Sequence, residues 1–340
     1  MPRRFAWASL PDEELLKLRF KNLKVTIEGT WLETCLRELY RELRRRGLKI
    51  RPHAWLSDEW FSPDNTPGIA IPFYLAHPRF MRLERKKIID VEGGSMRECM
   101  RILRHEAGHV MQHAYRLQQR RRWRELFGAS STPYPKYYRP SPRSKRYVQH
   151  LRQWYAQSHP DEDFAETFAV WLTPRSAWRK RYAGWPALKK LQYVDELMAE
   201  ITAEMPSLTR RREVDPIHRL NRTLAEHYKK KQALYVVDSW KTYDRDLRRI
   251  FSSEPGRRPL RTAAAFLRKN RGKIRRRVSK ATGEYQLTLD AVLDEMIGRC
   301  HMMKLWAVGS ERKLIRGFTV LLTAKTVHSL YSPSRRSFAL

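Results

Sequence analysis

The chain has 340 residues, 41% of them hydrophobic, so it is long enough to form one large domain or two with a buried core. Its 11 Trp, 15 Tyr and 12 Phe residues exclude an intrinsically disordered protein. Three cysteines, Cys35, Cys99 and Cys300, are odd in number and form no C-x-x-C pair. This argues against a disulfide framework or a cysteine zinc knuckle and fits a reducing compartment.

The net charge is +33, from 69 Lys and Arg residues against 36 Asp and Glu residues. Such a charge attracts polyanions, so nucleic acid is a candidate partner, although arginines spread along the whole chain also fit an ordinary solvated surface. The N-terminal residues lack the apolar core of a signal peptide, and no run of about 18 apolar residues occurs. We therefore expect a cytoplasmic protein without a membrane span.

The first part of the chain is predicted to be mainly helical. Residues 30–47 place apolar side chains on one helical face, and Thr30 and Glu33 form a capping box at the start of this helix. Gly47 is a stop signal at its end. The helix should therefore pack its apolar face into the core and expose a basic outer face.

A strand is predicted at residues 69–76, because apolar and small residues alternate there with period two. Pro72 cannot donate to a ladder, so the strand should lie at the edge of a sheet. A free edge can pair with an extended peptide, although an ordinary blunted edge is the simpler interpretation. Residues 79–94 are expected to pair back on this strand.

Residues 95–115 predict an amphipathic helix that carries the most informative motif of the chain. Ser95 and Glu98 form a capping box, and apolar residues follow at helical spacing. The helix contains the H-E-x-x-H pattern His105-Glu106-Ala107-Gly108-His109. The pattern lies on a predicted helix, which makes a chance occurrence in a packed helix the weaker interpretation.

The spacing of this motif suits a zinc ion. His105 and His109 lie one turn apart on one face of a helix, at a separation that a tetrahedral zinc can bridge. Glu106 projects beside them, where it can hold a metal-activated water and accept its proton. Ala107 and Gly108 are small and leave room for close packing.

A third ligand is predicted on a later helix. A long polar and basic insertion at 117–151 comes first, and a helix then begins at Pro160 and ends at Pro174. Glu166 lies in this helix among apolar neighbours, where a carboxylate is costly unless it is paired or bound to a metal. We therefore expect a His105, His109 and Glu166 site with one position open for water.

Neighbouring acidic and histidine residues receive other roles. Asp163, one turn before the expected ligand, could hydrogen-bond a ligand histidine. Asp161 and Glu162 are interpreted as charges that favour the N-terminus of the helix. His113 lies about 12 Å from His105 along the helix axis, so one ion cannot bind both.

Amide hydrolysis also needs a donor for the developing oxyanion. His159 is the candidate nearest to the predicted ligand helix and is the one we favour as a catalytic residue. Tyr155, His150 and the pair Tyr137 and Tyr138 remain open, and a structural role fits each of these candidates as well.

The C-terminal third is predicted to be helical. A basic, proline-containing break at 209–216 suggests a boundary between domains at 1–208 and 209–340. Helices are expected at 217–233, 236–251, 258–277, 287–305 and 311–330. Residues 268–277 are the densest basic run; they could contact phosphates but lack the interleaved aromatic residues needed for base stacking.

The two motifs together resemble a known family. HEAGH followed by a helix reading DEDFAETFAVWL is similar to the gluzincin metallopeptidases, and especially to the bacterial putative zinc-binding metallopeptidases. The resemblance covers roughly residues 50–205. It implies zinc bound by His105, His109 and Glu166, with Glu106 as the general base.

These observations lead to one expected protein and two alternatives. We expect an α+β, mainly helical fold with a zincin-like catalytic domain, an edge strand, an H-E-x-x-H helix and a helical C-terminal domain. The expected activity is hydrolysis of peptide bonds in a peptide or protein substrate by a zinc metallopeptidase. The alternatives are a nucleic-acid-associated zinc protease that acts on bound proteins, and a non-catalytic protein in which zinc only holds the fold.

Overall fold

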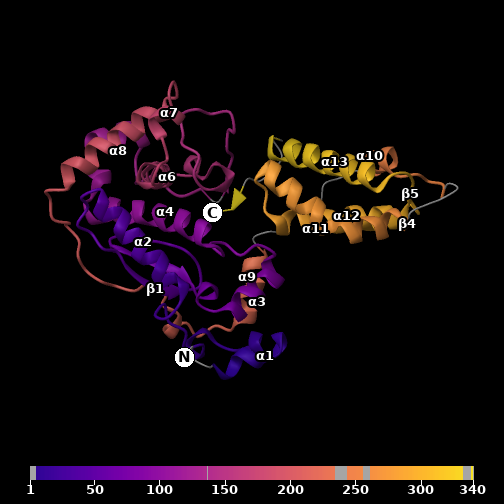
Figure 1. The fold of residues 1–340 in the computed structure, drawn as a ribbon, viewed down its shortest axis with the longest axis horizontal. Helices are drawn as coiled ribbons and strands as arrows, with labels where there is room; N and C mark the ends of the chain where they lie inside the picture. Colours follow the sequence, from indigo (N-terminus) through magenta and orange to yellow (C-terminus); the bar gives the residue numbers. More distant parts are fainter. Residues whose placement is uncertain (1–4, 136, 234–242, 256–260, 332–337, 340) are drawn as a thin grey trace. The chain divides into compact units, whose positions relative to one another are not determined.

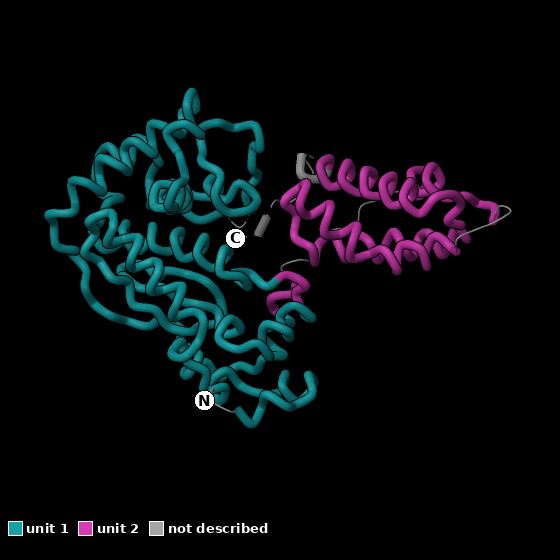
Figure 2. The backbone as a smooth tube through the Cα atoms, in the orientation of Figure 1, with its two compact units in different colours: residues 1–87, 91–229, 338–340 teal, residues 88–90, 230–337 magenta. Residues whose placement is uncertain are grey.

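The computed structural model describes residues 5–135, 137–233, 243–255, 261–331 and 338–339. It divides the chain into two compact units, coloured separately in Figure 2. Unit 1 holds residues 1–87, 91–229 and 338–340, and unit 2 holds residues 88–90 and 230–337.

The division falls about twenty residues after the boundary expected at 208/209. Residues that follow this expected boundary are tied to the start of the chain. The N–H of Phe20 donates to the carbonyl of Arg222 at 3.2 Å, and the N–H of Leu224 donates to the carbonyl of Leu18 at 2.9 Å. Backbone pairing between distant segments, which composition does not reveal, therefore keeps this stretch in unit 1.

Unit 1 is mainly helical. Its helices are α1 (Asp12–Lys17), α2 (Trp31–Arg45), α3 (Pro78–Ile88), α4 (Met96–Ala114), α5 (Arg121–Phe127), α6 (Pro160–Leu172), α7 (Trp178–Arg181) and α8 (Ala187–Ile201), and its segment 91–229 ends within α9 (Leu224–Ala233). Short 3-10 turns lie at Ala6–Ser9, Phe20–Asn22, Phe73–Ala76, Leu117–Gln119, Arg152–Gln157 and Ile217–Arg219. Two strands of two residues, β3 (Tyr137–Tyr138) and β6 (Phe338–Ala339), pair antiparallel.

Two of the predicted helix starts are confirmed in detail. The hydroxyl of Thr30 accepts from the N–H of Leu32 at the start of α2. The hydroxyl of Ser95 accepts from the N–H of Glu98 at the start of α4. Each cap satisfies a backbone donor that has no partner within its helix, so the two starts follow from local sequence.

The predicted strand at 69–76 is shorter than expected. β2 (Gly68–Pro72) pairs in parallel with β1 (His53–Ser57), and residues 73–76 form a 3-10 turn. Every residue of β2 is buried, and the N–H of Ala70 donates to the carbonyl of Phe61 at 2.8 Å on its other side. The free edge of β2 is therefore occupied at Ala70 by Phe61 of the same chain.

The prediction that residues 79–94 pair back as a strand is wrong. Most of this segment is α3, which buries Phe80 and Leu83 on one face. Their spacing of three residues is helical, and the Arg, Lys and Glu residues of α3 are good helix formers.

α4 runs through unit 1 beside both α2 and α6 (Figure 1). Gly108 makes the approach of α6 possible. A Cβ atom added to Gly108 would lie 2.7 Å from the Cα of Ala165 and 3.1 Å from its carbonyl oxygen. Both atoms belong to backbone that cannot move aside, so only glycine allows α4 and α6 to meet this closely.

We expect Gly108→Ala to lower the free energy of unfolding by about 1–3 kcal/mol, the usual cost of overpacking a core. Thermal unfolding measures the effect. Gly298→Ala in helix α12 (Gln286–Met302) is the matched control, because a Cβ there meets nothing within 4 Å and should stabilise the protein by up to about 1 kcal/mol. Equal effects of the two substitutions would contradict the close approach.

Unit 2 is a helical bundle that contains α10 (Asp244–Ile250), α11 (Ala263–Thr282), α12 (Gln286–Met302) and α13 (Glu311–Tyr331). Its core includes Leu247, Phe266, Leu293 and Phe318, all nearly inaccessible to solvent. A two-residue strand, β4 (Arg261–Thr262), pairs with β5 (Trp306–Ala307).

The helices predicted at 287–305 and 311–330 are confirmed, and the one predicted at 258–277 is shifted to 263–282. Of the helix predicted at 236–251, residues 236–242 lie outside the described residues, and helix α10 begins at Asp244. Over the described part of the chain, no helix is long and apolar enough to cross a membrane.

Candidate metal centre

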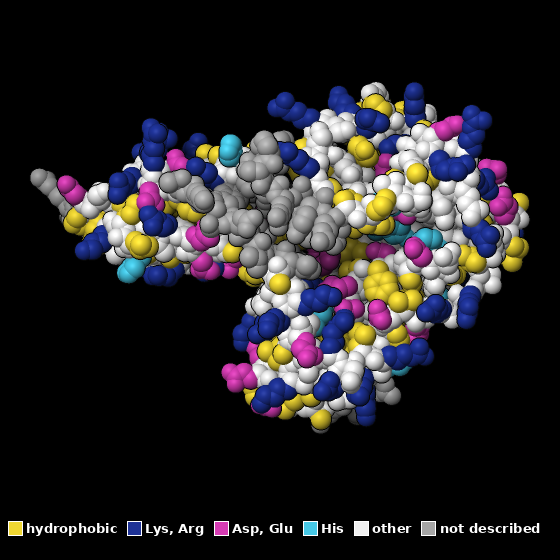
Figure 3. All heavy atoms as spheres, turned by 180° about the vertical axis from the view of Figure 1, so that it is seen from behind, with side chains coloured by type: hydrophobic (Ala, Val, Ile, Leu, Met, Phe, Trp, Pro, Cys, Tyr) yellow, Lys and Arg dark blue, Asp and Glu magenta, His cyan; other side chains and the backbone are white. Residues whose placement is uncertain are grey.

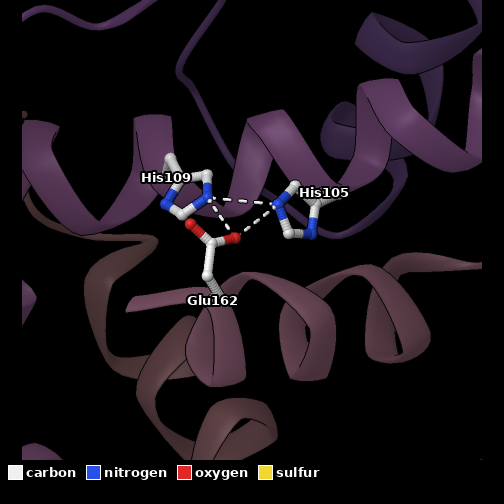
Figure 4. A group of neighbouring side chains, drawn as sticks. All are labelled: His105, His109 and Glu162. Carbon is white, nitrogen blue, oxygen red and sulfur yellow. Dashed lines mark hydrogen bonds and ion pairs between the residues drawn. The ribbon is translucent and has the colours of Figure 1, made fainter. Parts of the chain in front are cut away.

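Three buried side chains converge between α4 and α6 (Figure 4). The Nε2 atoms of His105 and His109 lie 3.2 Å apart, and Oε2 of Glu162 lies 3.0 Å from the first and 3.3 Å from the second. All three potential ligand atoms lie within 4.8 Å of one another. α4 supplies both imidazoles from one face, and the first turn of α6 directs the carboxylate between them.

The structure places Glu162, and not Glu166, beside the two Nε2 atoms. Glu166 lies on the other side of His105, where its Oε1 is 2.9 Å from Nδ1. Its second oxygen accepts from the N–H of Leu151 at 2.7 Å. Glu162 and Glu166 are one turn apart on the same face of α6, so the position of α6 along α4 decides which of them meets both imidazoles.

Sequence reasoning missed Glu162 because the run Asp161-Glu162-Asp163 also suits the start of a helix. A usable signal was nevertheless present. Glu162 and Glu166 have the same i, i+4 spacing as His105 and His109. When the histidine face of α4 packs against the glutamate face of α6, one carboxylate can lie beside both Nε2 atoms. The other carboxylate then lies beside Nδ1 of His105.

Glu166 has the orienting role that was expected of Asp163. A carboxylate at Nδ1 holds the proton of His105 on that atom, which leaves the lone pair of Nε2 directed toward the centre. The carboxylate of Asp163 instead forms an ion pair with Lys190, and it does not contact His105 or His109. Burial raises the pKa of Asp163 to about 7, although Lys190 opposes this shift.

The centre is electrostatically suited to a cation. Burial lowers the pKa of His105, but hydrogen bonds to Glu162 and Glu166 outweigh burial and raise that pKa well above its usual value. Burial also acts to raise the pKa of Glu162, yet His109 and His105 hold it far below the usual range. Protons and metal ions compete for these same atoms, so an anionic pocket that favours one cation also favours the other.

Glu106 is buried beside the centre, with 6% of its surface exposed. Its Oε2 atom has no hydrogen-bond partner among the described residues, although a buried polar atom normally has one. Burial raises the pKa of this carboxyl, with His105 and His109 opposing the shift. An orphaned, basic oxygen next to the imidazole pair is the group that a proton-accepting residue requires.

His159 is the N-cap of α6 and not a free donor. Its Nδ1 accepts from the N–H of Asp161 at 3.2 Å, and its Nε2 donates to the carbonyl of Thr132 at 2.7 Å. Both ring nitrogens are engaged, so His159 has no N–H left for an oxyanion. The sequence-based expectation of a catalytic His159 is therefore replaced by a structural role.

The other oxyanion candidates also have assigned positions. His150 contacts the carbonyl of Arg101 at 2.9 Å, and burial lowers its pKa to about 4, so it is neutral near pH 7. Tyr138 donates to the carbonyl of Gln153 at 3.0 Å. The ring of Tyr155 lies 5.6 Å from that of His105. The side chain of Tyr137 lies outside the described residues.

His113, which was expected not to share an ion with His105, lies apart from the centre. It is buried, and its Nε2 lies 3.4 Å from a carboxylate oxygen of Asp64. It does not join the group formed by His105, His109 and Glu162.

Tyr134, which sequence reasoning did not single out, reaches the centre from the insertion before α6. Its hydroxyl donates to Oε1 of Glu162 at 2.9 Å, and its ring stacks on His159 with centroids 3.8 Å apart. Ser130 donates to Asp161 at 3.0 Å from the same segment. The insertion is therefore fastened to the first turn of α6, which carries Glu162.

The residues fit a zinc ion. Two imidazole nitrogens and one carboxylate oxygen are the three-ligand set typical of a catalytic zinc, which keeps its fourth position open. A carboxylate behind one histidine, as Glu166 lies behind His105, is the usual outer support of such a site.

Figure 3 shows histidine and acidic side chains together at the surface of unit 1, although Lys and Arg side chains are spread over much of the molecule.

Residues 84–184 match a protein family described as putative zinc-binding metallo-peptidase. The matched segment contains both α4 and α6, and so all the residues of the centre. Comparisons with curated proteins and with solved structures found no match.

Proposed function

We propose that the chain is a zinc-dependent peptidase that hydrolyses peptide bonds, because residues 84–184 match the putative zinc-binding metallo-peptidase family. The observation that carries this proposal is the convergence of His105, His109 and Glu162 next to the unpartnered carboxylate of Glu106. The family match supports a peptide or protein substrate.

His105, His109 and Glu162 are the proposed ligands. Zinc bound there would polarise the scissile carbonyl and lower the pKa of a water molecule. Glu106 accepts the proton of the attacking water on its orphaned oxygen and passes it to the leaving amine. Burial raises the pKa of Glu106, which brings this carboxylate closer to the basicity that a general base needs near neutral pH.

Tyr134 is proposed as a positioning residue for Glu162. It holds Oε1 while Oε2 faces the imidazoles, so the carboxylate offers only one oxygen to a metal. A metal held through one oxygen of Glu162 would leave room for the water that Glu106 is proposed to activate. His159 supports this position of Tyr134. Its ring stacks on the ring of Tyr134, and its Nε2 donates to the carbonyl of Thr132, two residues before Tyr134.

We expect Tyr134→Phe to weaken zinc binding by about 10-fold, because losing an outer partner of a ligand typically costs 10–100-fold in affinity. Competition with a chelator measures this affinity, and the absorption spectrum of the Co²⁺ form reports a change to two-oxygen binding. Tyr138→Phe is the matched control, because its hydroxyl donates to the Gln153 carbonyl instead. Equal affinities and spectra for the two variants would contradict the positioning role.

The proposal is tested by metal analysis of the purified protein together with cleavage of a peptide library. One zinc per chain and cleavage that is lost on chelation and restored by zinc would support it. If zinc binds, no peptide is cleaved and chelation unfolds the protein, the site is structural and the peptidase proposal is wrong.

A further inference from the structure

Helix α11 carries two groups of cationic side chains, one with ion-pair partners in the bundle and one without. The first group faces α12. Arg271 contacts Asp290 at 2.5 Å and Asp294 at 2.6 Å, and Arg275 contacts Asp290 at 2.6 Å. These guanidinium groups are partly buried, and their charges are compensated within unit 2.

The second group is exposed and has no such compensation. We call it the α11 basic face, and it consists of Lys273, Arg276, Arg277 and Lys280. None of the four forms an ion pair with any residue that the structure describes. Lys273 lies three and four residues before Arg276 and Arg277, and Lys280 lies four and three residues after them, so members of the face repel one another and destabilise the isolated helix.

Other carboxylates of unit 2 are engaged by other cations. Asp244 pairs with Arg299, Asp246 pairs with Lys325, and Glu311 lies 3.8 Å from Lys269. The fold therefore concentrates its acidic groups on other parts of the bundle and leaves the α11 basic face with positive charge only.

In α2, part of the positive charge is balanced within the fold, although Arg44 and Arg45 form no ion pair with a described residue. There Glu38 pairs with Arg41 on the helix surface, and Glu42 is held by Arg104 at 2.6 Å. The same alternation of charge is absent from the α11 basic face. A like-charged stripe that repels itself gains stability when an external polyanion neutralises it.

We propose that the α11 basic face binds the phosphate backbone of double-stranded nucleic acid. Successive turns of the helix place cations about 5.4 Å apart, which suits a row of closely spaced phosphates. No large hydrophobic or aromatic side chain of α11 is exposed, so the helix offers neither a base-stacking platform nor an apolar group for a lipid surface. Binding of this kind is independent of base sequence.

The site is distinct from the metal centre, and its test needs no peptidase activity. Binding of the full-length protein to a fluorescent DNA duplex of about 20 base pairs is measured by anisotropy over a range of salt concentrations. The test variant replaces all four residues of the α11 basic face by glutamine, a good helix former. Circular dichroism checks that each variant is folded.

The matched control removes four exposed positive charges from or just after α2. It combines four substitutions, Arg37→Gln, Arg44→Gln, Arg45→Gln and Lys49→Gln. Its net charge equals that of the test variant, so the comparison separates a local binding surface from the general attraction of a basic protein.

We expect the test variant to lose at least about 10-fold in affinity at moderate salt, and its plot of log K against log salt to become less steep by about 3 to 4, close to one per lost phosphate contact. The control should retain the wild-type slope. Equal losses in the two variants would overturn the proposal. So would binding to vesicles of anionic lipid that depends on the four residues while duplex DNA is not bound.

Discussion

Glu106→Gln is expected to leave zinc bound and to reduce peptide hydrolysis by about 10³-fold, equivalent to about 4 kcal/mol of transition-state stabilisation. The substitution keeps the shape of the side chain but replaces the basic carboxylate by an amide, which does not take up a proton near neutral pH. His105, His109 and Glu162 are untouched, so metal content should match that of the wild type. The initial rate on a cleaved peptide and the zinc content of the same sample provide the two measurements.

The electrostatics of Glu106 give a second readout for this variant. Because burial raises the pKa of the Glu106 carboxyl, burial disfavours its charged form. A neutral amide should therefore not destabilise the fold, and thermal unfolding should show a stability equal to or above that of the wild type. Wild-type activity in Glu106→Gln would exclude the general-base role. Loss of zinc would instead assign Glu106 to metal binding.

Glu162→Gln should weaken zinc binding by more than about 100-fold. Losing a partner outside the coordination sphere costs up to about 100-fold, and losing a direct ligand should cost more. The substitution removes the negative charge that faces both Nε2 atoms. Glu166→Gln should cost about 10-fold, because an amide oxygen can still accept from one neighbour but no longer balances His105 as a carboxylate does. Titration against a chelator of known affinity measures both variants.

The paired variants distinguish the two possible third ligands. The larger loss in Glu166→Gln would restore the assignment suggested by the sequence and contradict the geometry of α6. Equal, small losses in both would show that neither carboxylate binds the metal. Because the two residues lie one turn apart on one helix and are both buried, differences in general packing between the variants are small.

Part of the centre could be predicted because it depends on local geometry alone. His105 and His109 share a helix, and an i, i+4 pair meets on one face wherever that helix is placed. The helix itself is signalled by Ser95 and Glu98, whose capping interaction lies within three residues of sequence. Glu106 follows from the same motif.

The role of His159 could not be predicted in this way. Its two ring nitrogens are satisfied by Asp161, two residues away, and by Thr132, which is distant in sequence. Tyr134 likewise reaches Glu162 only because the insertion folds back on the first turn of α6. Contacts between distant segments leave no periodic signal in the chain.

The sequence by itself determined the helical character of the protein, the imidazole pair and the carboxylate beside it, because helix periodicity and capping act over a few residues. Only the tertiary structure decided the third candidate ligand. Glu162 and Glu166 are both carboxylates on the same face of α6. Which of them lies beside the two Nε2 atoms depends on the position of α6 along the axis of α4. The close approach of Gly108 to Ala165 restricts this position. It places Glu162 beside the two Nε2 atoms and Glu166 beside Nδ1 of His105.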